Sequence, residues 1–251
     1  MTTLTERQIA ILKAVVDEYV QTARPVSSDR LEKKYSLGVS PATIRNEMSD
    51  LAEAGYLQKS HISAGRVPTP LGLKFYVHNL LKPQEISVKD EAGIKERIWP
   101  HREAKERLIR EATIELARRS GVLSLTIGPD EEFYLAGLAN ILNFPEFWDI
   151  DLTQSLLSVL DNYSFWQGII SKKGEEMPVY VLLGEELGGD YLSSCGFVFS
   201  RFNWNNRDYA IGVLGPCRLQ YSRVIPLVNF FGRLLSEFSF WKDEEKKLFG
   251  R

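Results

Sequence analysis

Cysteine and histidine, two residue types that often bind metals or act in catalysis, are scarce in this chain. Its 251 residues include two cysteines, Cys195 and Cys217, and three scattered histidines. Two cysteines are too few for a disulfide framework and lack the paired spacing of a zinc site, so we interpret both as small buried hydrophobic residues. No nucleophile motif and no set of carboxylates with metal-ligand spacing is present. We therefore expect no catalytic residue, no metal site, no cofactor and no enzymatic activity.

Long hydrophobic runs are also missing. No segment approaches the roughly 18 apolar residues of a membrane span, and the stretch from Met1 to Glu6 lacks a basic and then apolar leader. We expect a cytoplasmic protein without a membrane partner. With 44% apolar and 25% charged residues, the composition is ordinary for a globular protein, and the length indicates two domains.

Net charge is small, at −2, but it is unevenly distributed. Residues 1–82 carry 11 basic and 8 acidic residues, a net charge of +3, which leaves −5 for the remainder. Residues 54–82 contain four lysines or arginines and no carboxylate. A local positive field beside an acidic body suits a polyanion bound on one face.

Cap and turn residues divide residues 1–82 into short elements. We expect helices at 5–21, 27–35 and 40–54, two strands at 56–59 and 66–68, and a fourth helix at 69–81. Each helix begins at a Ser or Thr that can accept a free backbone N–H, and two of these precede a proline at the first helical position. The cap residues are Thr5, Ser27, Ser40 and Thr69. This order predicts a winged helix-turn-helix domain at 1–82.

The helix that begins at Ser40 has the pattern of a DNA-recognition helix. Ile44, Met48 and Leu51 fall within about 40° of one another on a helical wheel and form its core face. The opposite face is free, and a helix is narrow enough to enter a major groove about 12 Å wide. Because Glu47, Asp50 and Glu53 stand toward its C-terminal half, we expect only the N-terminal half to contact DNA.

Individual roles follow from side-chain chemistry. Arg45 can donate two hydrogen bonds to guanine, and Asn46 matches the donor and acceptor of adenine. Thr43 suits a thymine methyl or a phosphate, and Ser40 suits a cap or a phosphate. Basic residues of the wing would bind the DNA backbone or enter the minor groove. The predicted DNA-binding residues are Ser40, Pro41, Ala42, Thr43, Arg45, Asn46, Lys59, His61 and Arg66.

Simpler interpretations remain open at this point. An outward arginine on an amphipathic helix usually marks a solvated face, and winged helices also serve as protein–protein modules. His61 has the position of an ordinary surface-loop residue.

Residues 83–251 have a different pattern. We expect a polar linker at 83–100 and an α+β domain at 101–251. Its expected helices are 101–119, 151–162 and 219–238, and its expected strands are 122–127, 179–183, 196–202 and 209–214.

Two sets of motifs resemble the heat-inducible transcription repressor HrcA family. Val39–Met48 carries the first set, with Pro25–Ser28 before it and Ser63–Thr69 after it. The second set is Gly137–Phe147, Leu183–Glu186 and Gly212–Val224. The resemblance implies a dimeric repressor with a GAF-like second domain that binds an inverted repeat upstream of chaperone genes, assisted by a GroEL-type chaperonin.

The chain also departs from that family. Its members carry a long middle section with an inserted dimerising domain, where only Asp130 and Glu131 stand here. The resemblance therefore implies a trimmed second domain. We still expect a homodimer on double-stranded DNA, because two-fold symmetry matches an inverted repeat. Candidate dimer surfaces are the 152–160 helix, the aromatic residues at 163–166 and the 230–241 stretch. The alternative function is a ligand-sensing regulator of another regulon, acting through the GAF-like domain.

Overall fold

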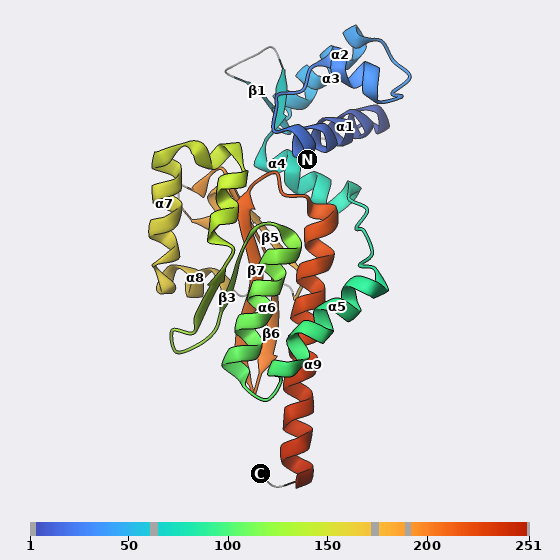
Figure 1. Ribbon diagram of the computed structural model, residues 1–251. Helices are drawn as coiled ribbons and strands as arrows, with labels where there is room; N and C mark the ends of the chain where they lie inside the picture. The colour runs from blue at the N-terminus through green and yellow to red at the C-terminus, as the bar shows by residue number, and fades with distance from the viewer. Residues whose placement is uncertain (1–3, 61–64, 172–175, 189–191, 250–251) are drawn as a thin grey trace. The chain divides into compact units, whose positions relative to one another are not determined.

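The computed structural model describes residues 4–60, 65–171, 176–188 and 192–249, with side chains to residue 240. They form two compact units (Figure 1). Unit 1 comprises Met1–Lys82 with Cys217–Tyr221, and unit 2 comprises Pro83–Pro216 with Ser222–Arg251.

Unit 1 is a winged helix-turn-helix, as the sequence predicts. Its elements are α1 (Glu6–Thr22), α2 (Ser28–Lys34), α3 (Pro41–Glu53), β1 (Leu57–Lys59), β2 (Arg66–Pro68), α4 (Pro70–Phe75) and a short π-helix, η1 (Tyr76–Leu80). The side chains of the four predicted cap residues accept backbone N–H groups at the starts of α1, α2, α3 and α4. Ile44, Met48 and Leu51 are buried, so the predicted core face of α3 is confirmed.

Two carboxylates in unit 1 are buried between helices. Glu18 of α1 is fully buried and binds Arg30 and Lys34 of α2. Glu47 of α3 is also buried and pairs with Arg7 of α1. The expectation that Glu47 stands with the acidic residues that limit DNA contact is therefore wrong, because its side chain faces α1.

The wing, formed by β1 and β2, is joined by backbone hydrogen bonds to the segment that precedes α2. Val26 and Arg66 exchange two such bonds, of 2.8 and 2.9 Å. Gly65 permits this approach, since a Cβ there would lie 2.9 Å from the Cβ of Pro25. The position of Arg66 is thus fixed by residues about 40 positions earlier in the chain.

Unit 2 has a GAF-like α+β fold. Its helices are α5 (Val88–Ile98), α6 (Lys105–Ser120), α7 (Ile150–Leu160), α8 (Tyr163–Ile170) and α9 (Tyr221–Phe249). Its strands are β3 (Leu123–Ile127), β4 (Phe133–Ala136), β5 (Tyr180–Leu183), β6 (Cys195–Trp204) and β7 (Arg207–Pro216). Short 3-10 helices are η2 (Trp99–His101), η3 (Leu138–Asn143), η4 (Pro145–Trp148) and η5 (Gly184–Leu187). The five strands form one antiparallel sheet in the order β4-β3-β7-β6-β5.

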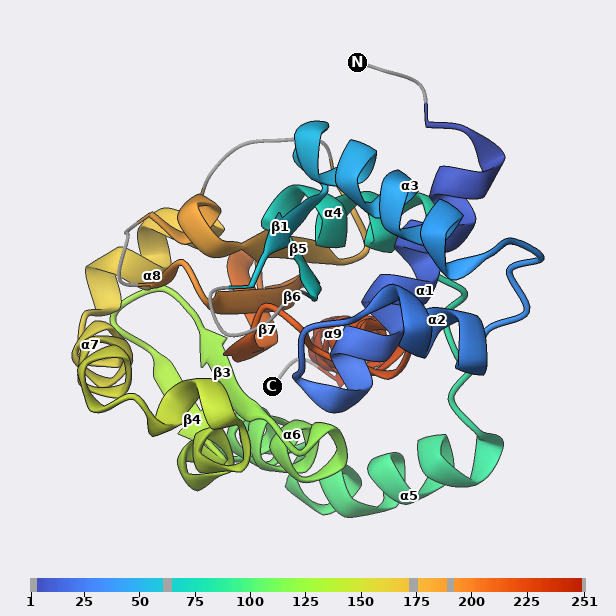
Figure 2. The same ribbon diagram turned by 90° about the horizontal axis from the view of Figure 1, so that it is seen from above.

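Helices cover both faces of this sheet. Figure 2 shows α7 and α8 on one side and α9 on the other. Alternate residues of β3 follow this division: Leu125 and Ile127 join the core with α7 and α8. Thr126 points to the other face and shares a 2.7 Å hydrogen bond with Thr113 of α6.

The expected linker at 83–100 is wrong over most of its length, because α5 occupies 88–98. Ile94 and Ile98 of α5 are buried, and Arg119 of α6 pairs with Asp90 of α5. The sequence did not predict β4 or α8. The other strands and helices lie near their expected positions, except that α9 continues to Phe249, 11 residues beyond its expected end at 238.

A tight turn joins β3 to β4. Asp130 and Glu131 both have positive φ, 54° and 61°, and the N–H of Gly128 donates to the carbonyl of Glu132 at 2.8 Å. Outside the turn, Lys105 donates to the Glu132 carboxylate at 2.6 Å. The two strands are therefore closed by a compact, hydrogen-bonded connection.

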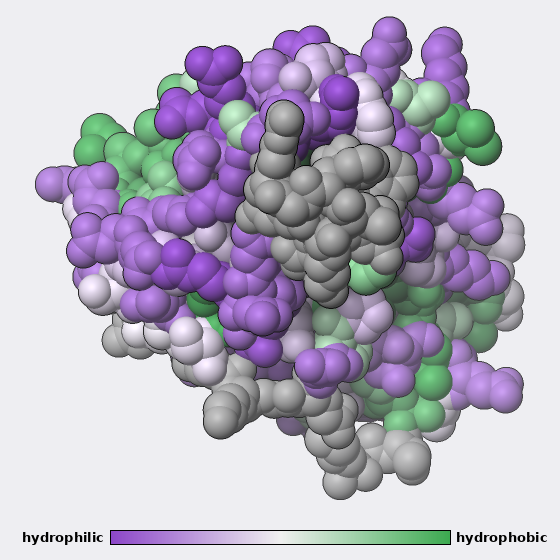
Figure 3. Space-filling view, turned by 90° about the horizontal axis from the view of Figure 1, so that it is seen from below, coloured by the Kyte–Doolittle hydropathy of each residue, from purple (hydrophilic) through white to green (hydrophobic). Residues whose placement is uncertain are grey.

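Several apolar side chains of unit 2 lie on its surface. Trp148, the last residue of η4, is 69% exposed, and Ile150, the first residue of α7, is 79% exposed. In Figure 3 apolar residues gather in separate green areas on a mainly polar face. Among the described residues, no helix is long and apolar enough to cross a membrane.

Candidate nucleic-acid interface

The N-terminal half of α3 presents most of the predicted DNA-binding residues. Ala42, Arg45 and Asn46 are exposed, while Pro41 occupies the first turn. The hydroxyl of Ser40 accepts the N–H of Thr43 at 3.2 Å and lies 3.0 Å from the Thr43 hydroxyl. Ser40 therefore caps the helix, and this bond fixes the first turn.

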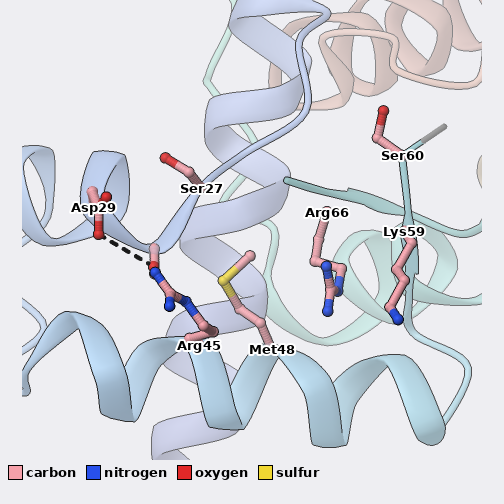
Figure 4. Close-up of a pocket in the computed structure, with 8 residues that line it drawn as sticks. Ser27, Asp29, Arg45, Met48, Lys59, Ser60 and Arg66 are labelled. Carbon is pink, nitrogen blue, oxygen red and sulfur yellow. Dashed lines mark hydrogen bonds between the residues drawn. The ribbon is translucent and has the colours of Figure 1, made fainter. Parts of the chain in front are cut away.

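A cavity of about 560 Å³ lies between α3, the start of α2 and the wing. Figure 4 shows Arg45 entering it from α3, and Lys59 and Arg66 entering from β1 and β2. We call this space the wing cavity. Its lining residues are Ser27, Ser28, Asp29, Arg45, Met48, Lys59, Ser60 and Arg66.

The wing cavity thus unites three of the predicted residues, Arg45, Lys59 and Arg66. His61 lies outside the described residues. Ser40, Pro41, Ala42, Thr43 and Asn46 belong to the adjoining surface of α3 and do not line the cavity.

Sequence reasoning missed the cavity residues Ser27, Ser28, Asp29 and Ser60 as site residues. Ser27 was identified only as a helix cap, and its hydroxyl does accept the N–H of Arg30 at 3.3 Å. The cap signal places these residues at the start of α2, but only the tertiary fold places them opposite the wing.

The wing cavity contains more positive than negative side chains. Lys59 and Arg66 are directly opposite one another in the β1–β2 register, an arrangement that is unfavourable for like charges. Asp29 is the one carboxylate among the described lining residues, and it accepts a 3.4 Å hydrogen bond from Ser28. Within the described part of the chain, neither Arg45 nor Lys59 forms an ion pair.

A different arrangement pairs the cations between α1 and α2 with a buried carboxylate. Lys34 lies 2.6 Å from Glu18, which also accepts hydrogen bonds from Arg30 and from the Tyr35 hydroxyl. Burial alone would raise the pKa of Glu18, but the hydrogen bonds from Lys34 and Arg30 outweigh it and keep this pKa below its usual value. Burial, reinforced by the nearby Glu18 charge, raises the pKa of Tyr35 to about 12.

Comparison with known proteins identifies the family. A family model described as the HrcA protein C terminal domain matches residues 79–225. The chain belongs to the HrcA family. The heat-inducible transcription repressors HrcA of Pelotomaculum thermopropionicum and Desulforudis audaxviator are each 28% identical to it, over 93% and 92% of this chain and 96% of each relative. This HrcA chain is therefore a member of a family of transcription repressors, not of a family of enzymes.

A solved structure supports the fold. A crystal structure described as a hypothetical protein superposes with a TM-score of 0.75 at 18% identity, covering 94% of the HrcA chain and 98% of its own. The fold is thus shared over nearly all of both chains.

The relatives contain residues that this HrcA chain lacks. Their alignments extend over 335 and 332 positions, more than the 251 residues present here. The family resemblance implies that the missing segment belongs at Asp130 and Glu131, the two residues with left-handed backbone in the β3–β4 turn. In this chain the β3–β4 hairpin occupies the position expected for the insertion.

Proposed function

We propose that this HrcA protein represses heat-shock genes by binding an inverted-repeat operator as a homodimer, with α3 in the major groove. The observation that carries the proposal is the exposed N-terminal half of α3 beside a cavity lined by three cations. The proposed contacts are the nine residues predicted from the sequence, with Asn46 reading a base. A GroEL-type chaperonin is the proposed assisting partner, on the strength of family resemblance.

The dimer contact is proposed for the exposed apolar surface around α7. Trp148 and Ile150 are available there. In the other candidate surfaces, Trp166, Phe230 and Phe238 are buried in unit 2, and Phe240 of the 230–241 stretch is 60% exposed. Burial removes these three side chains as contact residues.

Selection of bound fragments from the host genome tests the operator. We expect enrichment of a two-fold-related motif near chaperone genes. Enrichment of a motif without two-fold symmetry would contradict the dimeric operator, and absence of any enriched motif would contradict sequence-specific repression.

Asn46→Ala tests base reading by α3. Asn46 is exposed, and loss of a bidentate contact to adenine costs about 1–3 kcal/mol of discrimination. We expect the affinity ratio between the selected duplex and a random duplex to fall by about 5- to 150-fold in fluorescence-anisotropy titrations. Asn79→Ala, an exposed asparagine of η1 in the same unit, is the matched control. An unchanged ratio for Asn46→Ala would exclude base reading at this position.

A further inference from the structure

The wing cavity has a defined place in the proposed complex. In duplex DNA, one sugar–phosphate strand separates the major groove from the adjacent minor groove. A helix in the first groove and a hairpin in the second must therefore hold that strand between them. The space between α3 and the wing is the wing cavity, so the proposed docking passes a strand of phosphates through it.

The chemistry of the lining suits a phosphodiester. Arg45, Lys59 and Arg66 supply three cations, and charge-assisted hydrogen bonds from such groups to phosphate oxygens are stronger than neutral ones. Ser27 and Ser60 add hydroxyl donors of the kind that commonly contact the DNA backbone.

The register of the wing supports an anionic occupant independently. Lys59 and Arg66 are cross-strand partners in a two-stranded hairpin, and like charges in this position destabilise the pair. A phosphate between the two side chains would turn this repulsion into two attractions.

The site is also built before DNA arrives. The Val26–Arg66 backbone bonds hold β2 against the segment leading into α2, and Gly65 leaves room for that contact. Such preorganisation lowers the entropic cost of binding.

We propose, on the basis of the proposed function, that the wing cavity holds one DNA strand and that Arg45 binds its phosphates together with Lys59 and Arg66. Arg45 is thereby a backbone ligand and not a reader of guanine, the role that its position on the recognition helix suggested. Base reading is left to Asn46 and its neighbours on α3.

Salt-dependent anisotropy titrations of the full chain test this assignment on the selected duplex and on a random duplex. We expect Arg45→Ala and Lys59→Ala each to reduce the salt slope by about 0.9 on both duplexes. In both variants, the ratio of the affinity for the selected duplex to the affinity for the random duplex should stay within about twofold of the value for the unsubstituted protein. Arg45→Lys retains the slope, because lysine binds phosphate as a point charge.

Lys33→Ala is the matched control, since Lys33 is an exposed cation of α2 outside the wing cavity. We expect it to leave the slope unchanged. An unchanged slope for Arg45→Ala, or a 5- to 150-fold loss of the affinity ratio, would overturn the phosphate assignment. A failure of the proposed function can be told apart from a failure of the phosphate assignment. The salt slope on random DNA tests the phosphate contacts even if the protein has no specific operator.

Free phosphate compounds present the same chemistry, and the cavity volume lies within the range of small-ligand pockets. Calorimetric titration of the protein with sodium pyrophosphate, without DNA, separates the two sources. We expect no saturable binding at micromolar concentrations. Micromolar binding that is lost in Arg45→Ala would identify a free phosphate ligand and overturn the strand assignment.

Discussion

Unit 1 contains two groups of basic residues with opposite environments. Between α1 and α2, Arg30 and Lys34 both pair with the buried carboxylate of Glu18. In the wing cavity, Lys59 and Arg66 face each other in register, and Arg45 points into the same space. The cations of the first group are paired with a carboxylate inside the fold, and this pairing stabilises the fold. The described lining of the wing cavity carries three cations and one carboxylate, Asp29, an excess of positive charge that is expected of an anion-binding surface.

Of the changes that test this comparison, removal of the buried carboxylate of Glu18 should have the largest effect. Glu18→Gln keeps the side-chain volume but replaces charged hydrogen bonds to Arg30 and Lys34. We expect the free energy of unfolding of unit 1 to fall by about 1–3 kcal/mol, measured by hydrogen exchange in α1 and α2. DNA affinity at temperatures where unit 1 remains folded should be unaffected.

The chain provides an internal control for that measurement. All five tryptophans, at 99, 148, 166, 204 and 241, belong to unit 2. Their fluorescence transition should be unchanged in Glu18→Gln. Equal exchange rates in α1 and α2 of both proteins would show that the buried pair contributes nothing to stability.

Acid should also reduce the stability that the pairs of Glu18 with Arg30 and Lys34 give to unit 1, by a smaller amount than Glu18→Gln. Because the Lys34 and Arg30 hydrogen bonds outweigh burial, the pKa of Glu18 is lower in the folded protein. A carboxyl of this kind contributes stability above its unfolded pKa, about 4.3, and loses the contribution as pH falls through the folded value. We expect the exchange difference between Glu18→Gln and the parent protein to shrink below about pH 4. A difference that grows on acidification would contradict this sign.

Some elements of the fold could be predicted from the sequence, and others could not. The helices of unit 1 were predictable because Thr5, Ser27, Ser40 and Thr69 mark their starts within a few residues of the groups they cap. By contrast, α5 has only two buried apolar residues, Ile94 and Ile98, in a charged segment, so its pattern resembles a linker. The four residues of β4 form an edge strand without a clear alternation of burial.

The candidate site also has features that could be predicted from the sequence and features that could not. Helical periodicity places Arg45 and Asn46 on the exposed side of α3. It does not show that Arg45 shares a cavity with Arg66, because β2 is fixed there by its bonds to Val26. Nor does it show that Glu47 pairs with Arg7, 40 positions away. Local spacing therefore predicts which residues are exposed, and long-range pairing decides what they face.

The smallest expected effect concerns Asp29, the carboxylate among the cavity residues. A negative charge about 4 Å from a phosphate costs on the order of 1 kcal/mol in water, so we expect Asp29→Asn to tighten binding about fivefold on both specific and random DNA. Glu32→Gln, on the same helix but outside the wing cavity, controls for net charge and should have less effect. Weaker binding of the specific duplex alone would instead make Asp29 an acceptor for a base or the residue that positions Arg45. Equal gains for both variants would show that the wing cavity has no special role, since overall charge alone would then explain the change in affinity.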